Sequence, residues 1–243
     1  ELAAHSFIRG RVIIVSTGFY SDRLQLLLPK GCEVELVDYW DFSEVKGQYD
    51  WVLCAYTETS QAFMCDIEKV KEKALQLSAN LFVDGTGSIG LEPNHELADV
   101  VSFSSCKGLF GITGASFVAY KDCLERYDTD SYYFNMANQE NKMVTGPYHA
   151  ISSLFNIMDN HSIYLQRVKN SKKKVMSTFA NCIPSLSNQP LLCTYLKAAI
   201  RGADDKVVLY APRSSLPGSV LCHLGEIHHE SVDICERIIV EEI

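Results

Sequence analysis

Leu81-Phe82-Val83 is the stretch that decides the fold, because it is a short apolar run that ends on a carboxylate, Asp84. Runs of the same kind recur through the first half of the chain, and each is expected to be a β-strand. They are residues 12–15, 34–37, 51–54, 81–83, 100–103 and 116–119. Strands that are apolar on both faces predict an α/β fold, with a mostly parallel sheet covered by helices on both faces.

Helical patterns lie between and after these runs. Between the third and fourth, one helical face carries Ile67, Val70, Ala74 and Leu75. After Pro147 a longer pattern continues toward residue 180 and carries Leu154, Ile157, Met158, Tyr164, Leu165, Val168 and Val175. This pattern predicts a helix that links the large domain to a second, smaller one.

The C-terminal part is expected to be a small α+β domain. Its strand candidates lie near residues 191–195, 206–210 and 219–223. A closing helix is expected from about Glu230, with Val232, Ile234, Cys235, Ile238 and Ile239 on it. The sequence therefore predicts a large α/β domain at residues 1–146, and a linking helix with the small domain at residues 147–243.

Charge and hydropathy exclude several classes of partner. The chain has 243 residues, 22 basic and 30 acidic side chains and a net charge of -8, which disfavours binding to nucleic acid or anionic lipid. The one basic run, Lys172 to Lys174, is expected to be a solvated helix face. No signal-peptide pattern is present, and the apolar runs are too short to span a membrane.

Nine cysteines, an odd number without a CxxC pair, predict reduced, buried thiols in a cytoplasmic protein. The pair His228-His229 has no cysteine or carboxylate cluster at the spacing of a zinc site, so a helix start is expected there. No metal is predicted.

Asp84 and Lys107 are the candidate chemical groups. Each follows an apolar run, so a buried carboxylate and a buried amine would be delivered to the same edge of the sheet. Lysine is rare at the end of an apolar strand unless it is paired or functional. Pyridoxal phosphate chemistry requires this combination, because the amine forms a Schiff base with the cofactor and the carboxylate keeps the pyridine nitrogen protonated.

A dinucleotide site is the competing interpretation, because Gly85-Thr86-Gly87-Ser88-Ile89-Gly90 matches GxGxxG. That motif must open a long helix, whereas Pro93 and Asn94 interrupt this one. At least three expected strands precede the motif, whereas it belongs to the first strand of a dinucleotide-binding fold, and the charge of Asp84 would lie beside a pyrophosphate. The nicotinamide interpretation is therefore disfavoured.

Several segments, in order, resemble the class V aminotransferases of the fold-type I pyridoxal phosphate enzymes, and within them the 2-aminoethylphosphonate–pyruvate transaminases. They are VSTGFYSDR at 15–23, TET at 57–59, VDGTGSIG at 83–90, SSCKG at 104–108, VTGPYH at 144–149 and LGEI at 224–227. Gly111 and Gly114 continue the glycine-rich stretch after the lysine.

The resemblance implies a role for each matching residue. Lys107 would be the Schiff-base lysine, Asp84 the partner of the pyridine nitrogen, and Ser104 a ligand of the cofactor phosphate. Tyr20 would stack on the pyridine ring. Thr145 would reach the phosphate of the neighbouring subunit's cofactor, which implies a homodimer with a shared active site.

Two departures from the family pattern stand out. The family's glycine/threonine-rich phosphate loop would precede Glu1, so a fragment of a longer protein is expected. The arginine that grips the acceptor carboxylate falls on Val220, which cannot make that pair, and Arg213 is the candidate substitute.

The sequence therefore predicts a cytoplasmic, pyridoxal phosphate-dependent transaminase acting on a small amine such as 2-aminoethylphosphonate, with pyruvate or another oxo acid as acceptor. Two alternatives stay open. One is a different pyridoxal phosphate reaction, a lyase or decarboxylase. The other is a non-catalytic relative that serves as an interaction module, which Val220 and the absent phosphate loop make credible.

Overall fold

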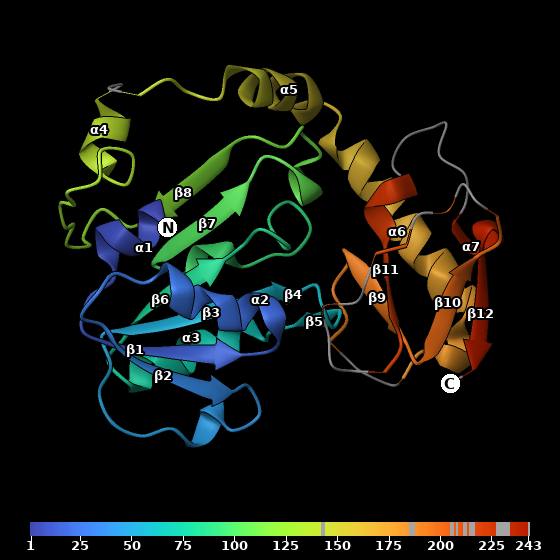
Figure 1. Cartoon of the computed structure of the whole chain (residues 1–243), viewed down its shortest axis with the longest axis horizontal. Helices are drawn as coiled ribbons and strands as arrows, with labels where there is room; N and C mark the ends of the chain where they lie inside the picture. The colour runs from blue at the N-terminus through green and yellow to red at the C-terminus, as the bar shows by residue number, and fades with distance from the viewer. Residues whose placement is uncertain are drawn as a thin grey trace.

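The six apolar runs form one six-stranded sheet in the order β2-β1-β3-β6-β7-β8 (Figure 1). Its strands are β1 Arg11–Ser16, β2 Glu33–Asp38, β3 Trp51–Ala55, β6 Asn80–Asp84, β7 Val100–Ser104 and β8 Ser116–Tyr120. This computed structural model describes residues 1–141, 144–184, 188–204, 207, 209–210, 213, 217–226 and 234–242. All six strand predictions are confirmed.

The sheet is mostly parallel. The pairs β1–β2, β1–β3, β3–β6 and β6–β7 are parallel, and only β8 runs antiparallel, against β7. The first five strands therefore end at one edge. Because β1 lies between β2 and β3, the strand order reverses there, and ligands of open α/β sheets bind in the crevice at such a point.

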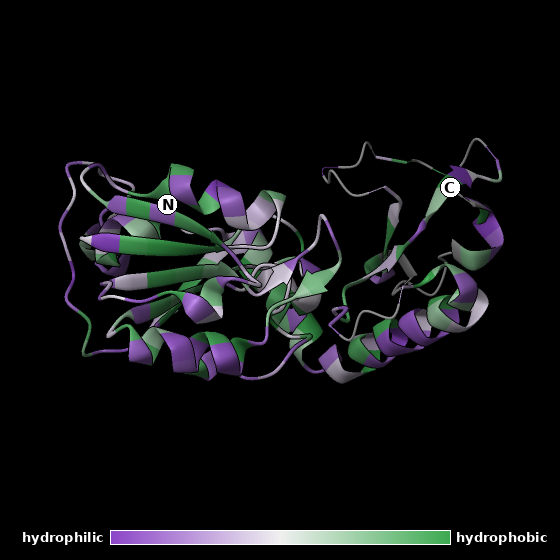
Figure 2. Cartoon of the chain, turned by 90° about the horizontal axis from the view of Figure 1, so that it is seen from below, coloured by the Kyte–Doolittle hydropathy of each residue, from purple (hydrophilic) through white to green (hydrophobic). Residues whose placement is uncertain are grey.

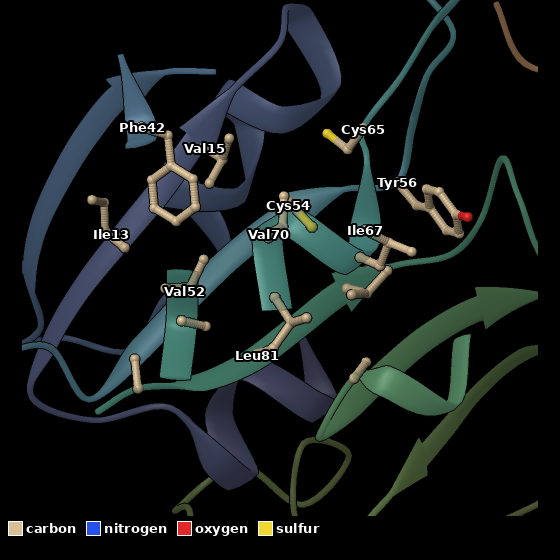
Figure 3. Close-up of a cluster of buried hydrophobic side chains, with 14 of the residues drawn as sticks. Ile13, Val15, Phe42, Val52, Cys54, Tyr56, Cys65, Ile67, Val70 and Leu81 are labelled. Carbon is tan, nitrogen blue, oxygen red and sulfur yellow. The ribbon is translucent and has the colours of Figure 1, made fainter. Parts of the chain in front are cut away.

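The central strands β1, β3 and β6 are buried on both faces, which explains their continuous apolar runs, whereas the edge strand β2 is largely exposed. Along β1, Ile13 and Val15 face one core, while Val12 and Ile14 face the other. The first core packs against α3 (Ile67–Gln76), whose Ile67 and Val70 contact Val52, Cys54 and Leu81 from the strands (Figure 3). This arrangement confirms the predicted layers.

The other face is covered by α1 (Leu2–Phe7), by α4 (Met136–Glu140) and by Leu24, which follows the short α2 (Phe19–Asp22). A small hairpin, β4 (Thr57–Glu58) and β5 (Phe63–Met64), follows β3. Single 3₁₀ turns at Arg23–Leu27, Phe42–Glu44, His95–Leu97 and Lys107–Leu109 complete this part of the chain.

The linking helix is two helices, which corrects the prediction of one pattern running toward residue 180. Helix α5 spans Tyr148–Met158 and α6 spans His161–Thr178. Asp159 and Asn160 separate them, and the Asn160 carbonyl accepts the N–H of Ile163 as the new helix starts.

The C-terminal part packs on α6 beside the carboxyl ends of the parallel strands (Figures 1 and 2). It contains two antiparallel pairs, β9 (Cys193–Leu196) with β11 (Ser219–Cys222) and β10 (Ala198–Gly202) with β12 (Ile238–Glu242). Two of the three strand candidates are thus confirmed. Of the candidate at 206–210, Val207, Leu209 and Tyr210 are described and are not in a strand, while the other residues lie outside the described part.

The prediction of a closing helix is wrong for the second half of that segment. Helix α7 covers only Ile234–Arg237, and Ile238 and Ile239 belong to β12, because their backbone pairs with Gly202 and Arg201 of β10. The start of that expected helix, together with His228 and His229, lies outside the described residues.

Two surface expectations also need correction. Lys172 is not a solvated lysine, because its Nζ donates to the carbonyls of Gln189 and Pro190, both at 2.7 Å, and burial lowers its pKa. Cys123 and Cys222 are exposed, unlike the buried Cys54, Cys65 and Cys193. Within the described residues, no helix is long and apolar enough to cross a bilayer.

Candidate active site

Asp84 and Lys107 lie at the same edge of the sheet. Asp84 is the last residue of β6 and Lys107 follows the end of β7, and these two strands are neighbours. Both side chains are partly buried. The Asp84 carboxylate accepts the N–H of Thr86 at 2.9 Å, which turns the chain sharply after the strand.

Lys107 sits on a strained turn. Its φ is 55°, a left-handed backbone conformation that residues other than glycine rarely adopt. Residues in this conformation are concentrated at functional sites. The turn is held tightly, because a Cβ on Gly108 would lie 2.2 Å from the Ile89 carbonyl. His161 at the start of α6 adds a 2.8 Å contact between its Nε2 and the Gly108 carbonyl.

A cavity of about 220 Å³ lies between Asp84 and Lys107. Its walls come from four segments that are distant in the sequence. They are Tyr20, Arg23, Leu24 and Leu27, then Thr57 and Thr59, then Asp84, Thr86 and Gly87, and finally Lys107. The cavity thus combines one amine, one carboxylate, one aromatic face and hydroxyl groups.

Tyr20 is surrounded by cations. The Nζ of Lys107 lies 5.8 Å from the centre of its ring, and the guanidinium carbons of Arg23 and Arg213 lie 6.0 and 5.9 Å from it. Arg213 also donates a hydrogen bond to the Tyr20 hydroxyl at 2.9 Å. These positive charges suit an anionic ligand.

A second cavity, of about 410 Å³, lies next to the first at the ends of β1 and β2. Arg213 and Phe19 line it together with Asp22, Asp38, Gln61 and the rings of Tyr39, Trp40 and Phe63. Arg213 therefore faces this larger cavity and reaches the first cavity only through Tyr20.

Two expected site residues lie elsewhere. Ser104 is not among the residues that line either cavity, and its Oγ contacts Cys106 Sγ at 3.0 Å within its own loop. Thr145 is exposed in the segment before α5. Val220 lies in β11 opposite Tyr195 and packs in the apolar cluster around it.

The cavity contains residues for which the sequence predicted no role. Thr57 and Thr59 belong to the segment TET, whose match to the family pointed to this part of the chain. A single sequence, however, does not show which hydroxyl groups face a cavity. Arg23 ends another matched segment, and Leu24 and Leu27 follow it. Only the fold brings these segments to the lysine.

The glycine motif forms a turn in this structure. Residues 85–94 contain no helix, and the next element is a single 3₁₀ turn at His95–Leu97. Behind the turn, burial lowers the pKa of His95, whose Nε2 lies 2.8 Å from Ser88 Oγ. A dinucleotide site lacks the long helix it requires here.

Within the described part of the chain, no group of three or more histidine, cysteine or acidic side chains is arranged to hold a metal. The chemistry that this edge of the sheet offers is that of an amine, a carboxylate and an aromatic ring around one cavity.

The chain has the fold of the fold-type I aminotransferases. It is similar to pyridoxamine–pyruvate aminotransferase from Mesorhizobium loti, with a TM-score of 0.69 and 16% identity over 90% of this chain and 69% of that one. Alanine–glyoxylate aminotransferase from Nostoc sp. gives a TM-score of 0.64 and 18% identity, over 85% of this chain and 63% of the other.

Cysteine desulfurase from Thermococcus onnurineus shares the fold as well, with a TM-score of 0.57 and 18% identity over 80% of this chain and 60% of that one. The chain thus spans about 60 to 69% of the length of these three solved structures. No protein-family model matches it, and no curated protein matches its sequence.

Proposed function

We propose that this chain is the cofactor-binding part of a pyridoxal phosphate-dependent aminotransferase. The observation that carries the proposal is the single cavity that Lys107, Asp84 and Tyr20 line together. Support also comes from the solved structures of similar fold, since two of those reported above are aminotransferases.

The residues present fit this cofactor. An amine, a carboxylate and an aromatic face are the groups that bind its aldehyde, its ring nitrogen and its ring. Arg23 adds a positive charge suited to a phosphate. Thr57 also lines the cavity, and its buried Oγ1 has no hydrogen-bond partner among the described residues, so it has a bond to offer a ligand.

When bound, pyridoxal phosphate supplies an electrophilic carbon and an electron-accepting ring. Lys107 would hold the cofactor through its Nζ and, once displaced by the donor amine, would take a proton at that nitrogen and return it. Asp84 would hold a proton on the ring nitrogen. Tyr20 would cover one face of the ring, and Leu24 and Leu27 would exclude water.

For the substrates, we propose a small amine as donor and an oxo acid as acceptor. Pyruvate and glyoxylate appear in the names of the similar aminotransferases, which supports a small oxo acid. Arg213, hydrogen-bonded to Tyr20, would bind the anionic end of the substrate in place of the arginine that Val220 replaces, and a phosphonate such as that of 2-aminoethylphosphonate suits it.

Ser104 as a phosphate ligand and a cytoplasmic location stay predictions, as does the division of the chain at residue 146.

We also propose a homodimer. Helix α5 supports it, because one stripe of that helix is apolar and exposed: Tyr148 is 75%, Ile151 50%, Phe155 81% and Met158 59% exposed. Such a stripe is typical of a protein interface. Thr145 lies just before it, so a second copy docked on α5 would bring Thr145 toward its neighbour. Phe155→Asp should then convert a dimer into a monomer in light scattering.

The experiment that tests the function has two stages. The purified protein is mixed with pyridoxal phosphate, and a visible absorption band of lysine-bound cofactor is expected in the wild type but not in Lys107→Ala. A panel of amines with pyruvate or glyoxylate then identifies the donor. A protein that binds the cofactor but aminates neither oxo acid with any donor would remove the transaminase proposal.

A further inference from the structure

Glu58 is a fully buried carboxylate, 0% exposed, beside the proposed active site. Its Oε2 accepts the N–H groups of Tyr20 and Ser21, at 2.9 and 3.0 Å. Its Oε1 accepts the N–H and the hydroxyl of Ser60, at 3.1 and 2.5 Å. Both oxygens are therefore used, as a buried carboxylate requires.

The two bonds to Tyr20 and Ser21 hold the first turn of α2. That helix has only four residues and buries a single side chain, that of Ser21, so it has little packing of its own. Bonds to an ionised acceptor are about twice as strong as neutral ones. The carboxylate of Glu58 therefore fixes the backbone from which the ring of Tyr20 projects.

The neighbouring residues make room for this contact. Gly18 has a φ of 144°, and a Cβ there would lie 3.0 Å from Glu58 Cγ and 2.9 Å from Gln61 Nε2. Glycine thus lets the carboxylate approach the helix. On either side of Glu58 in the chain, Thr57 and Thr59 line the cavity. Residues 57–59 therefore both line the cavity and hold the backbone of α2.

We propose that Glu58 is a positioning residue, which holds Tyr20 at the cavity wall so that an aromatic ligand can pack against its ring. The proposal rests on the proposed function, because it assumes that a flat ring binds beside Tyr20. It assigns a role to a residue that does not itself line the cavity.

Glu58→Gln tests this role with little change in volume. Donors face both oxygens of Glu58, so an amide must turn its NH₂ group toward at least one backbone N–H. Glu92→Gln is the matched control, because Glu92 is also a carboxylate that accepts a backbone N–H, that of Leu191 at 2.6 Å. Glu92 does not line the cavity.

The measurement is the affinity for pyridoxamine 5′-phosphate, which carries an amine in place of the aldehyde and so binds without a bond to Lys107. Glu58→Gln should weaken binding about fivefold in the wild-type background. In a Tyr20→Ala background it should weaken binding by less than about twofold, since the ring it positions is gone. Glu92→Gln should leave the affinity unchanged in both backgrounds.

Equal weakening in the two backgrounds would overturn the proposal, because Glu58 would then act without Tyr20. Hydrogen exchange on the cofactor-free protein gives a second readout. The amides of Tyr20 and Ser21 should exchange faster in Glu58→Gln than in the wild type, and unchanged exchange would also overturn the proposal.

Ser60→Ala is the alternative variant if Glu58→Gln does not fold. It removes the hydrogen bond from the Ser60 hydroxyl to Glu58 and leaves the carboxylate in place. It should shift both readouts in the same direction by a smaller factor, and no shift in either would count against the proposal. A wild-type protein that fails to bind the ligand would instead refute the proposed function, and the exchange data would still show whether Glu58 holds Tyr20.

Discussion

Both ends of the β6–β7 strand pair combine an aspartate with lysine, but the two ends use these residues differently. At the amino end, Asp99 pairs with Lys71 and Lys121, with both Nζ–Oδ distances at 2.7 Å. At the carboxyl end, Asp84 and Lys107 line a cavity, and no ion pair joins them among the described residues. The same residue types thus brace the fold at one end and are left available for a ligand at the other.

The amino end is a closed cluster. Asp99 is 7% exposed and also accepts the N–H of Leu81 at 2.7 Å. Burial alone would raise the pKa of Asp99, but hydrogen bonds from Lys121, Lys71 and the Leu81 N–H outweigh it and hold that pKa below its usual value. A lysine whose bonds are satisfied in this way is structural.

Lys107→Ala should have the largest effect in this comparison. If Lys107 holds the cofactor and moves the proton as proposed, loss of its amine should lower the rate of amine transfer by about 10³-fold. The melting temperature of the cofactor-free protein should stay unchanged, because no ion pair of Lys107 is lost. Lys121→Ala should do the reverse, with a lower melting temperature and normal cofactor binding.

Asp99→Ala should cost about 3 kcal/mol in the free energy of unfolding, measured by urea denaturation. The substitution leaves two ammonium groups and the Leu81 N–H without their shared acceptor. The folded variant should still bind pyridoxal phosphate. A variant that keeps its stability but loses the cofactor would reverse the roles assigned to the two ends.

Asp84→Asn should lower the rate of amine transfer by about 10²-fold, because a neutral amide does not hold a proton on the ring nitrogen. The side-chain oxygen can still accept the N–H of Thr86, so stability should change little. Rate measurements at saturating amine and oxo acid check this prediction, with Asp99→Asn as the control at the other end. Equal rates for Asp84→Asn and the wild type would contradict the role of Asp84.

Mild acid should weaken the C-terminal part before it affects either end of the sheet. Burial and the charge of Lys172 lower the pKa of His223 to about 4. An unfolded histidine has a pKa of about 6.5, so protons favour the unfolded chain increasingly as the pH falls from 6.5 toward 4. Stability should drop by about 2 kcal/mol between pH 7 and pH 5, and His223→Gln should remove most of that drop.

Asp99 should affect the stability of the protein at a lower pH than His223 does. Because the folded pKa of Asp99 is depressed, its stabilising effect is complete above the unfolded value of about 3.9 and is lost as the pH falls through the folded value. The stability difference between the wild type and Asp99→Asn should therefore be constant from pH 7 to pH 5 and shrink below about pH 4. Chemical denaturation at several pH values checks this, and a difference that already shrinks at pH 6 would contradict it.

The central strands β1, β3 and β6 were predictable because they are buried on both faces, which leaves apolar runs with few alternatives. The C-terminal strands were harder to predict. The stretch Ala198-Ala199-Ile200-Arg201-Gly202 has low strand propensity and becomes β10 only by pairing with β12. Ile238 and Ile239 fit a helix or a strand equally well by spacing, and the same pairing decides between them.

At the site, the sequence predicted the groups that end strands, because strand ends are visible in a pattern. It did not identify the groups that reach the cavity from other segments, such as Arg23 and Thr59. Lys172 was misjudged for the same reason, since the carbonyls that bind it belong to residues 189 and 190.

The most direct test is to identify the lysine that captures the cofactor. The protein is incubated with pyridoxal phosphate, reduced with borohydride to make any lysine-bound cofactor permanent, and mapped by peptide mass spectrometry. Modification of Lys107, absent from the same digest of Lys107→Ala, is the predicted result. Modification of Lys71, Lys121 or Lys172 with Lys107 untouched, or no modification at all, would contradict the assignment of the active site.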